Sequence, residues 1–400
     1  MERIVLRDVC DIIDGPHATP TKTESGPVYL GIDAITEDGR LNEADFAHLS
    51  VEDYKKWTRR VTPTEGDIVF SYEATLGRYA VIPKGFYGCL GRRLAVIRNR
   101  SEAINTKWLY YYFRSPEWDA FIRRNTIKGS TVNRISVEDF PNYTIPAVKR
   151  EQQDRIAGIL GAIDKKISTN NAINDNLEAT IQAAFDKAFH DAGVSLPETI
   201  IKQNKVPQGW TDATVGDFAS VQTGPFGSQL HNEDYVESGT PIITVEHMDG
   251  KYIAHRNLPL VSQNDVDRLR KYDLHTGDIV FSRVGSVDRA VMVSQHEDGW
   301  LFSGRCLRVR PYDPNTGSYF LWWFNQPVIR QLVTASAVGA TMPSINTSIL
   351  NSIRIVFPQK DIVTQFCKMA DGLIEIIATN LEEIRKLNDA REYIQLSLSR

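Results

Sequence analysis

The sequence predicts an α+β fold in which two pseudo-twofold-related α/β domains are separated by a long antiparallel two-helix coiled coil. The first observation behind this prediction is a helical seam that occurs twice, near the middle of the chain and at its end. The second is the hexapeptide Gly-Asp-Ile-Val-Phe-Ser, which begins at Gly66 and again at Gly277. The third is the length of 400 residues, which is more than one hydrophobic core usually serves.

The first seam lies between Glu151 and His190, a stretch without proline. Its apolar residues recur at alternating steps of four and three, as Ile156, Leu160, Ile163, Ile167, Leu177 and Ile181. This spacing is typical of a coiled coil, and the helix would be about 60 Å long. Asn170 and Asn174 interrupt the seam, where a buried polar residue costs stability but can fix the register. A kinked or frayed surface helix is the competing interpretation.

The partner helix is predicted in the same chain, from Asp361 to Arg400. Its seam residues are Phe366, Ala370, Leu373, Ile377, Ile384, Leu387, Ile394 and Leu398. Thr379-Asn380 repeats Thr169-Asn170 at an offset of 210 residues. Antiparallel pairing would bring Asn170 and Asn380 together at the pseudo-twofold axis, so we expect this pair to help set the register.

The repeats divide the chain into five parts. We predict a first domain at 1–148, a central helix at 149–190, a linker at 191–210, a second domain at 211–358 and a C-terminal helix at 359–400. The linker contains two glycines and two prolines and shows no periodicity.

Both domains have the same order of segments, an internal repeat of about 210 residues. A Gly-Pro turn comes first, a strand-like run follows, and the hexapeptide then reads as a turn and a buried strand. After it, Gly91–Val96 corresponds to Gly304–Val309, and 129–135 corresponds to 339–345. The loops at 72–78 and 283–289 differ, as in two modules that read different targets, although neutral drift gives the same picture.

Each domain also contains an aromatic helix, at 108–113 and 319–324, which we expect to end before Pro116 and Pro327. Aromatic side chains can stack on nucleic-acid bases. At helical spacing they are more often core residues, and we expect these to be core.

The composition indicates a soluble globular protein, with 42% apolar and 24% charged residues. We find no apolar run of membrane length and no signal-peptide pattern, so we expect a cytoplasmic protein that does not bind membranes. The four cysteines lack the spacing of a zinc site or a disulfide framework, and we expect buried free thiols. They are Cys10, Cys89, Cys306 and Cys367.

The net charge of −4 and the pI of about 6.1 do not indicate a nucleic-acid binder, but local basic clusters can still bind phosphates. The sequence contains no amino-methyltransferase motif, P-loop, His-Glu-x-x-His motif or Gly-x-Ser-x-Gly elbow. We therefore predict no catalytic residue, no metal and no cofactor in this chain. It is better interpreted as a recognition subunit that gives specificity to an enzyme.

These features together resemble the specificity (S) subunit of Type I restriction-modification systems, the HsdS family, over nearly the whole chain. The motifs that carry the resemblance are the two hexapeptides, Gly224–Leu230, Pro207–Trp210, and Ile145-Pro146 leading into Glu151-Gln152. The resemblance implies two target-recognition domains, each reading one half of a split DNA sequence, with the helices setting the spacing.

The resemblance also implies the partners: double-stranded DNA, two methyltransferase (M) subunits and, where the system has them, two restriction (R) subunits. The M subunits would dock on the helices and methylate adenine N6 with S-adenosylmethionine, and the R subunits would use ATP and Mg. Two competing hypotheses are a duplicated protein–protein scaffold without DNA recognition and a stand-alone enzyme.

Polar and basic loop residues are the expected DNA contacts, because arginine can bond guanine and Asn or Gln can bond adenine. In the first domain we expect His17, Thr19, Tyr72, Arg78, Arg92, Lys128, Ser130, Thr131 and Asn133. In the second we expect Ser228, Gln229, Arg283, Ser286, Arg289, Arg305 and Thr341.

Two residues depart from the family's pattern. Arg391 occupies an apolar seam position, so that this end of the helix would fray or pair with a partner. Asp288 stands where the family often has glycine, which leaves the shape of its loop open.

Overall fold

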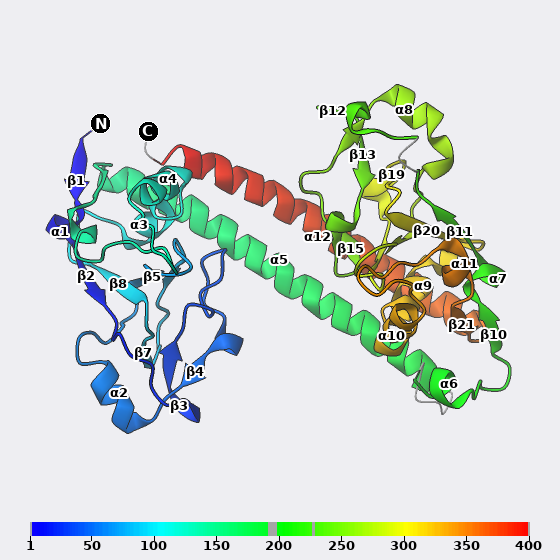
Figure 1. Ribbon diagram of the computed structural model, residues 1–400, viewed down its shortest axis with the longest axis horizontal. Coiled ribbons are helices and arrows are strands. Elements are labelled where there is room, and N and C mark those ends of the chain that lie inside the picture. The colour runs from blue at the N-terminus through cyan, green and yellow to red at the C-terminus, as the bar shows by residue number, and fades with distance from the viewer. Residues whose placement is uncertain (1, 191–197, 226–228, 399–400) are drawn as a thin grey trace. The chain divides into compact units, whose positions relative to one another are not determined.

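The computed structural model describes residues 2–190, 198–225 and 229–398 (Figure 1). The chain forms two compact units, which we call unit 1 (1–167 with 386–400) and unit 2 (168–385). Each unit contains one α/β domain and a part of both long helices, α5 (Arg150–His190) and α12 (Lys360–Leu396). The central and C-terminal helices that we predicted as separate parts of the chain are therefore each divided between the two units.

Unit 1 is built on the four-stranded antiparallel sheet β2-β8-β5-β6. A second sheet has the order β4-β3-β7, in which β3 and β7 run parallel, and β1 pairs with β9. The strands are β1 Arg3–Val5, β2 Cys10–Asp14, β3 Thr23–Leu30, β4 Ala47–His48, β5 Ile68–Ser71, β6 Tyr79–Val81, β7 Gly88–Leu90, β8 Leu94–Asn99 and β9 Thr144–Pro146. The shorter helices are α1 Leu6–Val9, α2 Val51–Trp57, α3 Thr106–Tyr112 and α4 Pro116–Arg124, with 3-10 turns η1 Glu43–Asp45 and η2 Phe140–Asn142.

Unit 2 repeats this plan, with the antiparallel sheet β11-β20-β17-β18 in place of β2-β8-β5-β6. Its second sheet is β12-β16-β13-β19, in which β13 and β19 run parallel, while β10 pairs with β21 and β14 with β15. The strands are β10 Thr211–Thr214, β11 Ala219–Thr223, β12 Tyr235–Val236, β13 Thr240–Ile243, β14 Met248–Asp249, β15 Tyr252–Ile253, β16 Leu260–Val261, β17 Ile279–Ser282, β18 Ala290–Met292, β19 Leu301–Phe302, β20 Cys306–Pro311 and β21 Arg354–Phe357. The helices are α6 Glu198–Gln203, α7 Val215–Phe218, α8 Gln263–Arg268, α9 Gly317–Phe324, α10 Pro327–Ala335 and α11 Thr347–Asn351, with 3-10 turns η3 Asn232–Asp234, η4 Val245–His247, η5 Arg270–Tyr272, η6 Gln295–Glu297 and η7 Pro314–Thr316.

The hexapeptide forms the strands β5 and β17, each in the interior of its four-stranded sheet and buried at every position. The turn before each strand contains a glycine with a positive φ, 89° at Gly66 and 90° at Gly277, a conformation that favours glycine. The aspartates that follow are buried and accept two hydrogen bonds each from an arginine of the neighbouring strand. These pairs are Asp67 with Arg98 at 2.6 and 2.8 Å, and Asp278 with Arg310 at 2.7 and 2.8 Å.

The aromatic helices α3 and α9 are core elements, as predicted, because their tryptophans and most of their tyrosines lie almost entirely out of water. The two prolines that we expected to end them instead begin the next helices, α4 and α10. A proline in the first turn of a helix costs little because its missing N–H would have no partner there. The predicted linker contains the helix α6, which its composition did not indicate, and residues 191–197 lie outside the described part.

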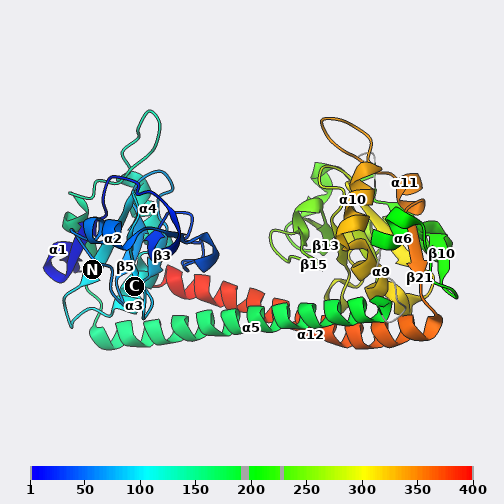
Figure 2. The same ribbon diagram turned by 90° about the horizontal axis from the view of Figure 1, so that it is seen from below.

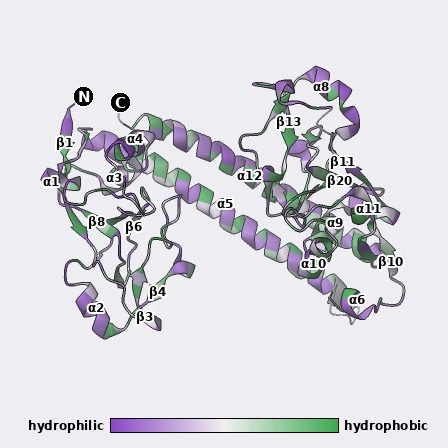
Figure 3. Ribbon diagram, in the orientation of Figure 1, coloured by the Kyte–Doolittle hydropathy of each residue, from purple (hydrophilic) through white to green (hydrophobic). Residues whose placement is uncertain are grey.

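The antiparallel pairing of α5 and α12 is confirmed, but its register differs from the expected one by a turn. Asn380 Nδ2 donates to Asn174 Oδ1 at 2.8 Å, and Asn170 Nδ2 donates to Glu383 Oε2 at 2.7 Å. Asn170 and Asn380 therefore do not bond each other. Asn380 lies level with Asn174, one turn or about 6 Å along α5 from Asn170. Hydrophobic and hydrophilic residues alternate in bands along both helices (Figure 3).

In unit 1 Arg391 is paired within the chain, and α12 continues past it to Leu396. Arg391 Nη1 donates to Asp164 Oδ1 of α5 at 3.1 Å, and Asp164 Oδ2 accepts from Tyr111 of α3 at 2.7 Å. Ile394 and Leu398 pack in the core of unit 1 together with Leu160. The carboxylate of Asp164 thus links both helices to the α/β domain.

All four cysteines are buried and free, as expected. Among the described residues, no helix combines the length and the apolar character that a membrane span requires. Within that same part of the chain, no group of three or more His, Cys, Asp and Glu side chains is arranged to hold a metal ion.

Candidate nucleic-acid interface

Four loops of unit 1 meet at one end of the strands of its main sheet, where β2 and β5 end and β8 begins. We call this surface reading edge 1. The loop after β2 is tied to the start of β8 by a hydrogen bond from Gly15 N to Leu94 O at 2.8 Å. The loop after β5 is tied to the segment before β8, because Tyr72 N donates to Arg93 O at 3.1 Å. The repeat therefore brings 15–20, 72–78 and 91–93 together.

The fourth loop is a hairpin, residues 127–134, here called hairpin 1. Ile127 and Arg134 exchange two backbone hydrogen bonds, at 2.8 and 3.1 Å, which close its base. Ala74 N donates to Asn133 O at 3.0 Å, and Ile135 N to Tyr72 O at 2.8 Å. Hairpin 1 is thus attached to the loop after β5, and it rises from the face of unit 1 opposite α5 (Figure 2).

Unit 2 has an equivalent reading edge 2, closed by backbone bonds between the same loops, with the acceptors shifted by one residue. Gly224 N donates to Cys306 O at 3.2 Å, and Arg283 N to Arg305 O at 2.8 Å. Its projecting loop is hairpin 2, residues 338–344, whose end residues Val338 and Ser344 exchange two hydrogen bonds of 2.9 Å. Hairpin 2 likewise rises from the side of unit 2 that faces away from α5 and α12 (Figure 2).

Eleven of the residues expected to contact DNA are exposed on these loops. In unit 1 they are His17, Thr19, Arg92, Lys128, Ser130, Thr131 and Asn133, and in unit 2 they are Ser286, Arg289, Arg305 and Thr341. Of these, His17 has an ion-pair partner, Asp14, whose carboxylate lies 2.8 Å from its ring and also pairs with Arg60 at 2.7 Å. Arg60 lies at the same edge and was missed, since nothing in the run Thr58-Arg59-Arg60 sets it apart from a solvated surface.

Four expected DNA contacts are engaged by groups within the protein. Tyr72 is only 6% exposed and packs in the core of unit 1, where burial raises the pKa of its hydroxyl. Arg78 donates to Ile35 O at 2.6 Å, and Arg283 donates to Gly304 O at 3.0 Å, so both guanidinium groups hold neighbouring loops. Gln229 Oε1 accepts from the Tyr272 hydroxyl at 2.6 Å. Ser228 lies outside the described residues.

A polar cavity of about 390 Å³ adjoins reading edge 2, and its charged lining consists of three arginines together with Glu246 and Asp249. Arg289 belongs to the loop after β17, Arg256 follows β15, and Arg330 lies on α10. Asp288 accepts from Arg330 at 2.5 and 2.9 Å, which defines the loop whose shape the sequence left open. Arg256 and Arg330 were missed because they are about 30 and 40 residues from Arg289 in the chain. Guanidinium groups of this kind bind phosphates.

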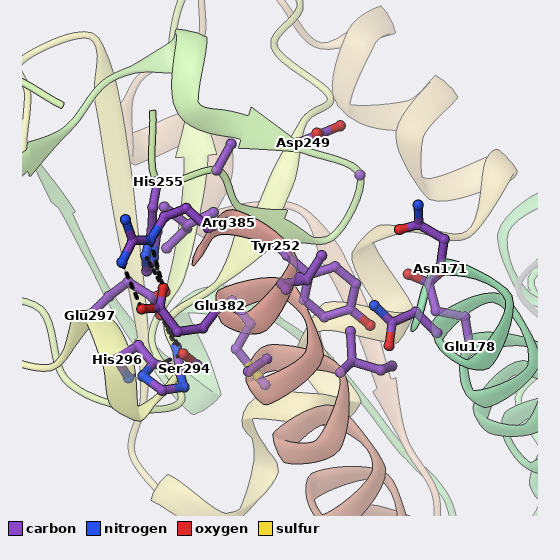
Figure 4. Close-up of a pocket in the computed structure, with 18 of the residues that line it drawn as sticks. Asn171, Glu178, Asp249, Tyr252, His255, Ser294, His296, Glu297, Glu382 and Arg385 are labelled. Atoms are coloured by element: carbon purple, nitrogen blue, oxygen red, sulfur yellow. Dashed lines mark hydrogen bonds and ion pairs between the residues drawn. The ribbon is translucent and has the colours of Figure 1, made fainter. Parts of the chain in front are cut away.

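The domain of unit 2 is braced on its segments of α5 and α12 by a charged network (Figure 4). The ring of His255 lies 2.5 Å from Glu297 Oε1 and 3.7 Å from Glu382 Oε2 of α12. Glu297 is 5% exposed, and Arg385 donates to Glu382 through two bonds of 2.8 Å. These groups line a cavity of about 410 Å³.

A second brace reaches α5, where Lys251 Nζ lies 2.7 Å from Glu178 Oε2 and 5.3 Å from the centre of the Trp322 ring. Charged pairs that are partly excluded from water hold a fixed geometry. The braces therefore position reading edge 2 on the helix pair.

The structure thus defines a class of protein, a duplicated recognition module in which two reading edges with different side chains are carried by one helix pair. A model of the Type I restriction modification DNA specificity domain matches residues 1–179 and again residues 207–386, nearly the whole chain. The chain belongs to this family, and it is a non-catalytic DNA specificity subunit of the Type I restriction-modification class. Each match joins one α/β domain to most of one long helix.

Known proteins agree with this membership. The chain is 21% identical over 343 residues to the MjaIX specificity subunit of Methanocaldococcus jannaschii, with 84% of this chain and 77% of that protein covered. It is 21% identical over 398 residues to the HindI specificity subunit of Haemophilus influenzae, with coverage of 82% and 85%. A crystal structure of the S subunit from M. genitalium shares the fold, with a TM-score of 0.63 at 14% identity over 99% of this chain and 95% of that one.

Proposed function

We propose that each unit reads one half of a bipartite DNA target through its reading edge. The observation that carries this proposal is that the same loops are joined by backbone hydrogen bonds in both units, while the exposed side chains on these loops differ. A shared backbone arrangement with different exposed side chains is what two domains that recognise different DNA sequences require.

The exposed residues fall into two groups by chemistry. Arg92, Arg305 and Asn133 can bond base edges in the major groove. The arginine cavity beside reading edge 2 suits the sugar–phosphate backbone, because phosphate contacts orient a protein on DNA without reading sequence. Reading edge 2 thus combines a group that specifies with groups that position.

The assembly that follows from this proposal contains two methyltransferase (M) subunits docked on the helical region, and α5 and α12 set the spacing between half-sites. The M subunits supply S-adenosylmethionine and methylate adenine N6. Two restriction (R) subunits, where the system has them, use ATP and Mg to cleave. The complex acts in the cytoplasm on double-stranded DNA. The names of the relatives, specificity subunits of Type I restriction enzymes, support these partners.

The test is a domain exchange read by methylation-sensitive sequencing in a host that expresses the chain with its M subunit. Replacing residues 1–145 by the same region of a relative should change one half of the methylated target and leave the other half and the spacer unchanged. The reciprocal exchange of 211–358 should change only the other half. If both halves change together in either exchange, the two-reader model is wrong. A protein–protein scaffold predicts no sequence-specific methylation at all.

A further inference from the structure

Hairpin 2 displays two large apolar side chains to solvent. Val338 is 66% exposed and Met342 is 67% exposed. From Ala337 to Ile345 the segment contains no charged residue. Large apolar side chains held in water on a projecting loop indicate a surface that is covered in a complex.

The backbone of hairpin 2 holds these side chains in place. Val338 and Ser344 close its base, and Gly285 N donates to Pro343 O at 2.9 Å, which ties this base to the loop after β17. Gly339 has a φ of 108°, and a Cβ atom there would lie 2.8 Å from Met342 O. The turn is therefore restricted to glycine at this position, and its shape is set before any partner binds.

Hairpin 1 is the equivalent loop of unit 1, but it is closed by Ile127 and Arg134, and its Gly129 lacks the positive φ of Gly339. Gly129 and Thr131 correspond to Gly339 and Thr341, but hairpin 1 adds the exposed cations Lys128 and Arg134. Its large exposed apolar residue is Ile127, at 43%. The two units therefore present projecting hairpins of different kind, one cationic and one apolar.

We propose that hairpin 2 enters the major groove and that Val338 and Met342 read thymine methyl groups in the half-site of unit 2. This inference rests on the proposed function of reading edge 2. The major groove admits a two-stranded ribbon and can also take a loop closed by the single bridge of Val338 and Ser344, whereas the minor groove is only about 6 Å wide. The C5-methyl of thymine is the apolar group that the base edges present there. The occupant is DNA because hairpin 2 is continuous with the polar loop that contains Ser286 and Arg289.

The experiment measures binding of the complex of this chain with its M subunits to its methylation target. Each thymine of the unit 2 half-site, on either strand, is replaced in turn by deoxyuridine, which removes the methyl group and keeps base pairing. At one or more positions the affinity should fall about fourfold, since burying one methyl group is worth about 0.8 kcal/mol and 1.4 kcal/mol is tenfold. Thymines in the unit 1 half-site serve as the internal control.

Met342→Ala and Val338→Ala should remove this preference, so that thymine and deoxyuridine bind equally in the unit 2 half while the unit 1 half is unchanged. Ile127→Ala in hairpin 1 is the matched control and should leave the unit 2 preference intact. Assembly with the M subunit, measured by gel filtration, should be normal for all three variants.

Three results would overturn the inference: a thymine to deoxyuridine ratio near one throughout the unit 2 half of the wild type, a ratio that survives in both alanine variants, or a half-site without A·T pairs. Contact of hairpin 2 with an M subunit would appear as lost assembly in the alanine variants. Insertion of a side chain between base pairs would appear as a rise in 2-aminopurine fluorescence on binding, which the alanine variants would lose. Either result also overturns the inference. Failure of the proposed function is distinct, because the wild-type complex would then select no target.

Discussion

Asn380 of α12 donates a hydrogen bond of 2.8 Å to Asn174 of α5, one turn away from Asn170, the residue it matches in the repeat. Asn174 is 7% exposed and Asn170 is 1% exposed, and Asn170 bonds Glu383 instead. Two buried amides thus contact different partners across the helix pair. Such polar contacts exclude registers in which an amide would face an apolar residue.

Replacing Asn380 by leucine should destabilise unit 2, because the buried carbonyl oxygen of Asn174 loses its donor. A buried acceptor without a partner costs about 1–3 kcal/mol. The double variant Asn174→Leu/Asn380→Leu should recover at least half of the loss in thermal unfolding, since both polar groups are then absent. The exposed neighbour Thr379→Ala is the control. A double variant as unstable as the sum of the two single variants would contradict this account.

The buried pair of Asp278 and Arg310 should be essential to unit 2. Asp278→Asn removes the buried carboxylate that accepts two bonds from Arg310, and because Asp273 stays 3.5 Å from that guanidinium we expect a loss of about 1.5–3 kcal/mol, the value of hydrogen bonds to charged groups. Asp67→Asn should lower the stability of unit 1 by a similar amount, because it bonds Arg98 in the same way. Urea unfolding followed by tryptophan fluorescence measures both, with the exposed Glu237→Gln as the control. A loss no greater than that of the control would refute the role of the pair.

The length of α5 should set the spacer of the DNA target. Inserting four residues after Ala172 adds about one turn and about 6 Å of helix, close to two base pairs at 3.4 Å each. We expect a spacer one or two base pairs longer with both half-sites unchanged, measured by methylation-sensitive sequencing. The same insertion after Asn204, beyond the end of α6, should leave the spacer as it was. Retained methylation with the original spacer would show that the helix does not set the distance.

The arginine cavity predicts a change in salt dependence. Arg256→Gln and Arg289→Gln should each weaken DNA binding to a similar degree for target and non-target sequences. Each should also reduce the slope of log affinity against log salt by about one, the value for one lost phosphate contact. The exposed Lys84→Gln, in the turn after β6 and away from the reading edges, is the control. An unchanged salt slope in both arginine variants would exclude phosphate contacts at this cavity.

The buried cysteines should resist alkylation in the folded protein. Burial raises the pKa of Cys10, Cys89 and Cys306 to about 12 and that of Cys367 to about 11. The reactive thiolate is therefore scarce at pH 8. Because these pKa values are higher in the folded state, the neutral thiols favour folding below pH 9, and this contribution declines as the pH rises toward 12. Mass spectrometry after iodoacetamide treatment should find labelling only in urea, and native labelling at pH 8 would contradict the prediction.

The sequence by itself determined the duplication, the type of the main elements and the core. The hexapeptide, the aromatic helices and the seams are local patterns in which burial, spacing and backbone conformation agree, so each predicts its own element. The loops of the reading edges could also be located from the sequence, because they follow strands that the repeat identifies. The helix α6 was not foreseen, since six residues are too few for a periodic signal.

Only the tertiary structure decided which polar side chains are available for DNA. Arg78 and Arg92 have the same chemistry in equally plausible loops, but Arg78 meets the carbonyl of Ile35 and Arg92 meets solvent. The cavity of Arg256, Arg289 and Arg330 and the one-turn offset of the asparagine contacts have the same origin. They depend on distances between residues far apart in the chain, and a side chain's own sequence neighbourhood carries no information about the group that packing places opposite it.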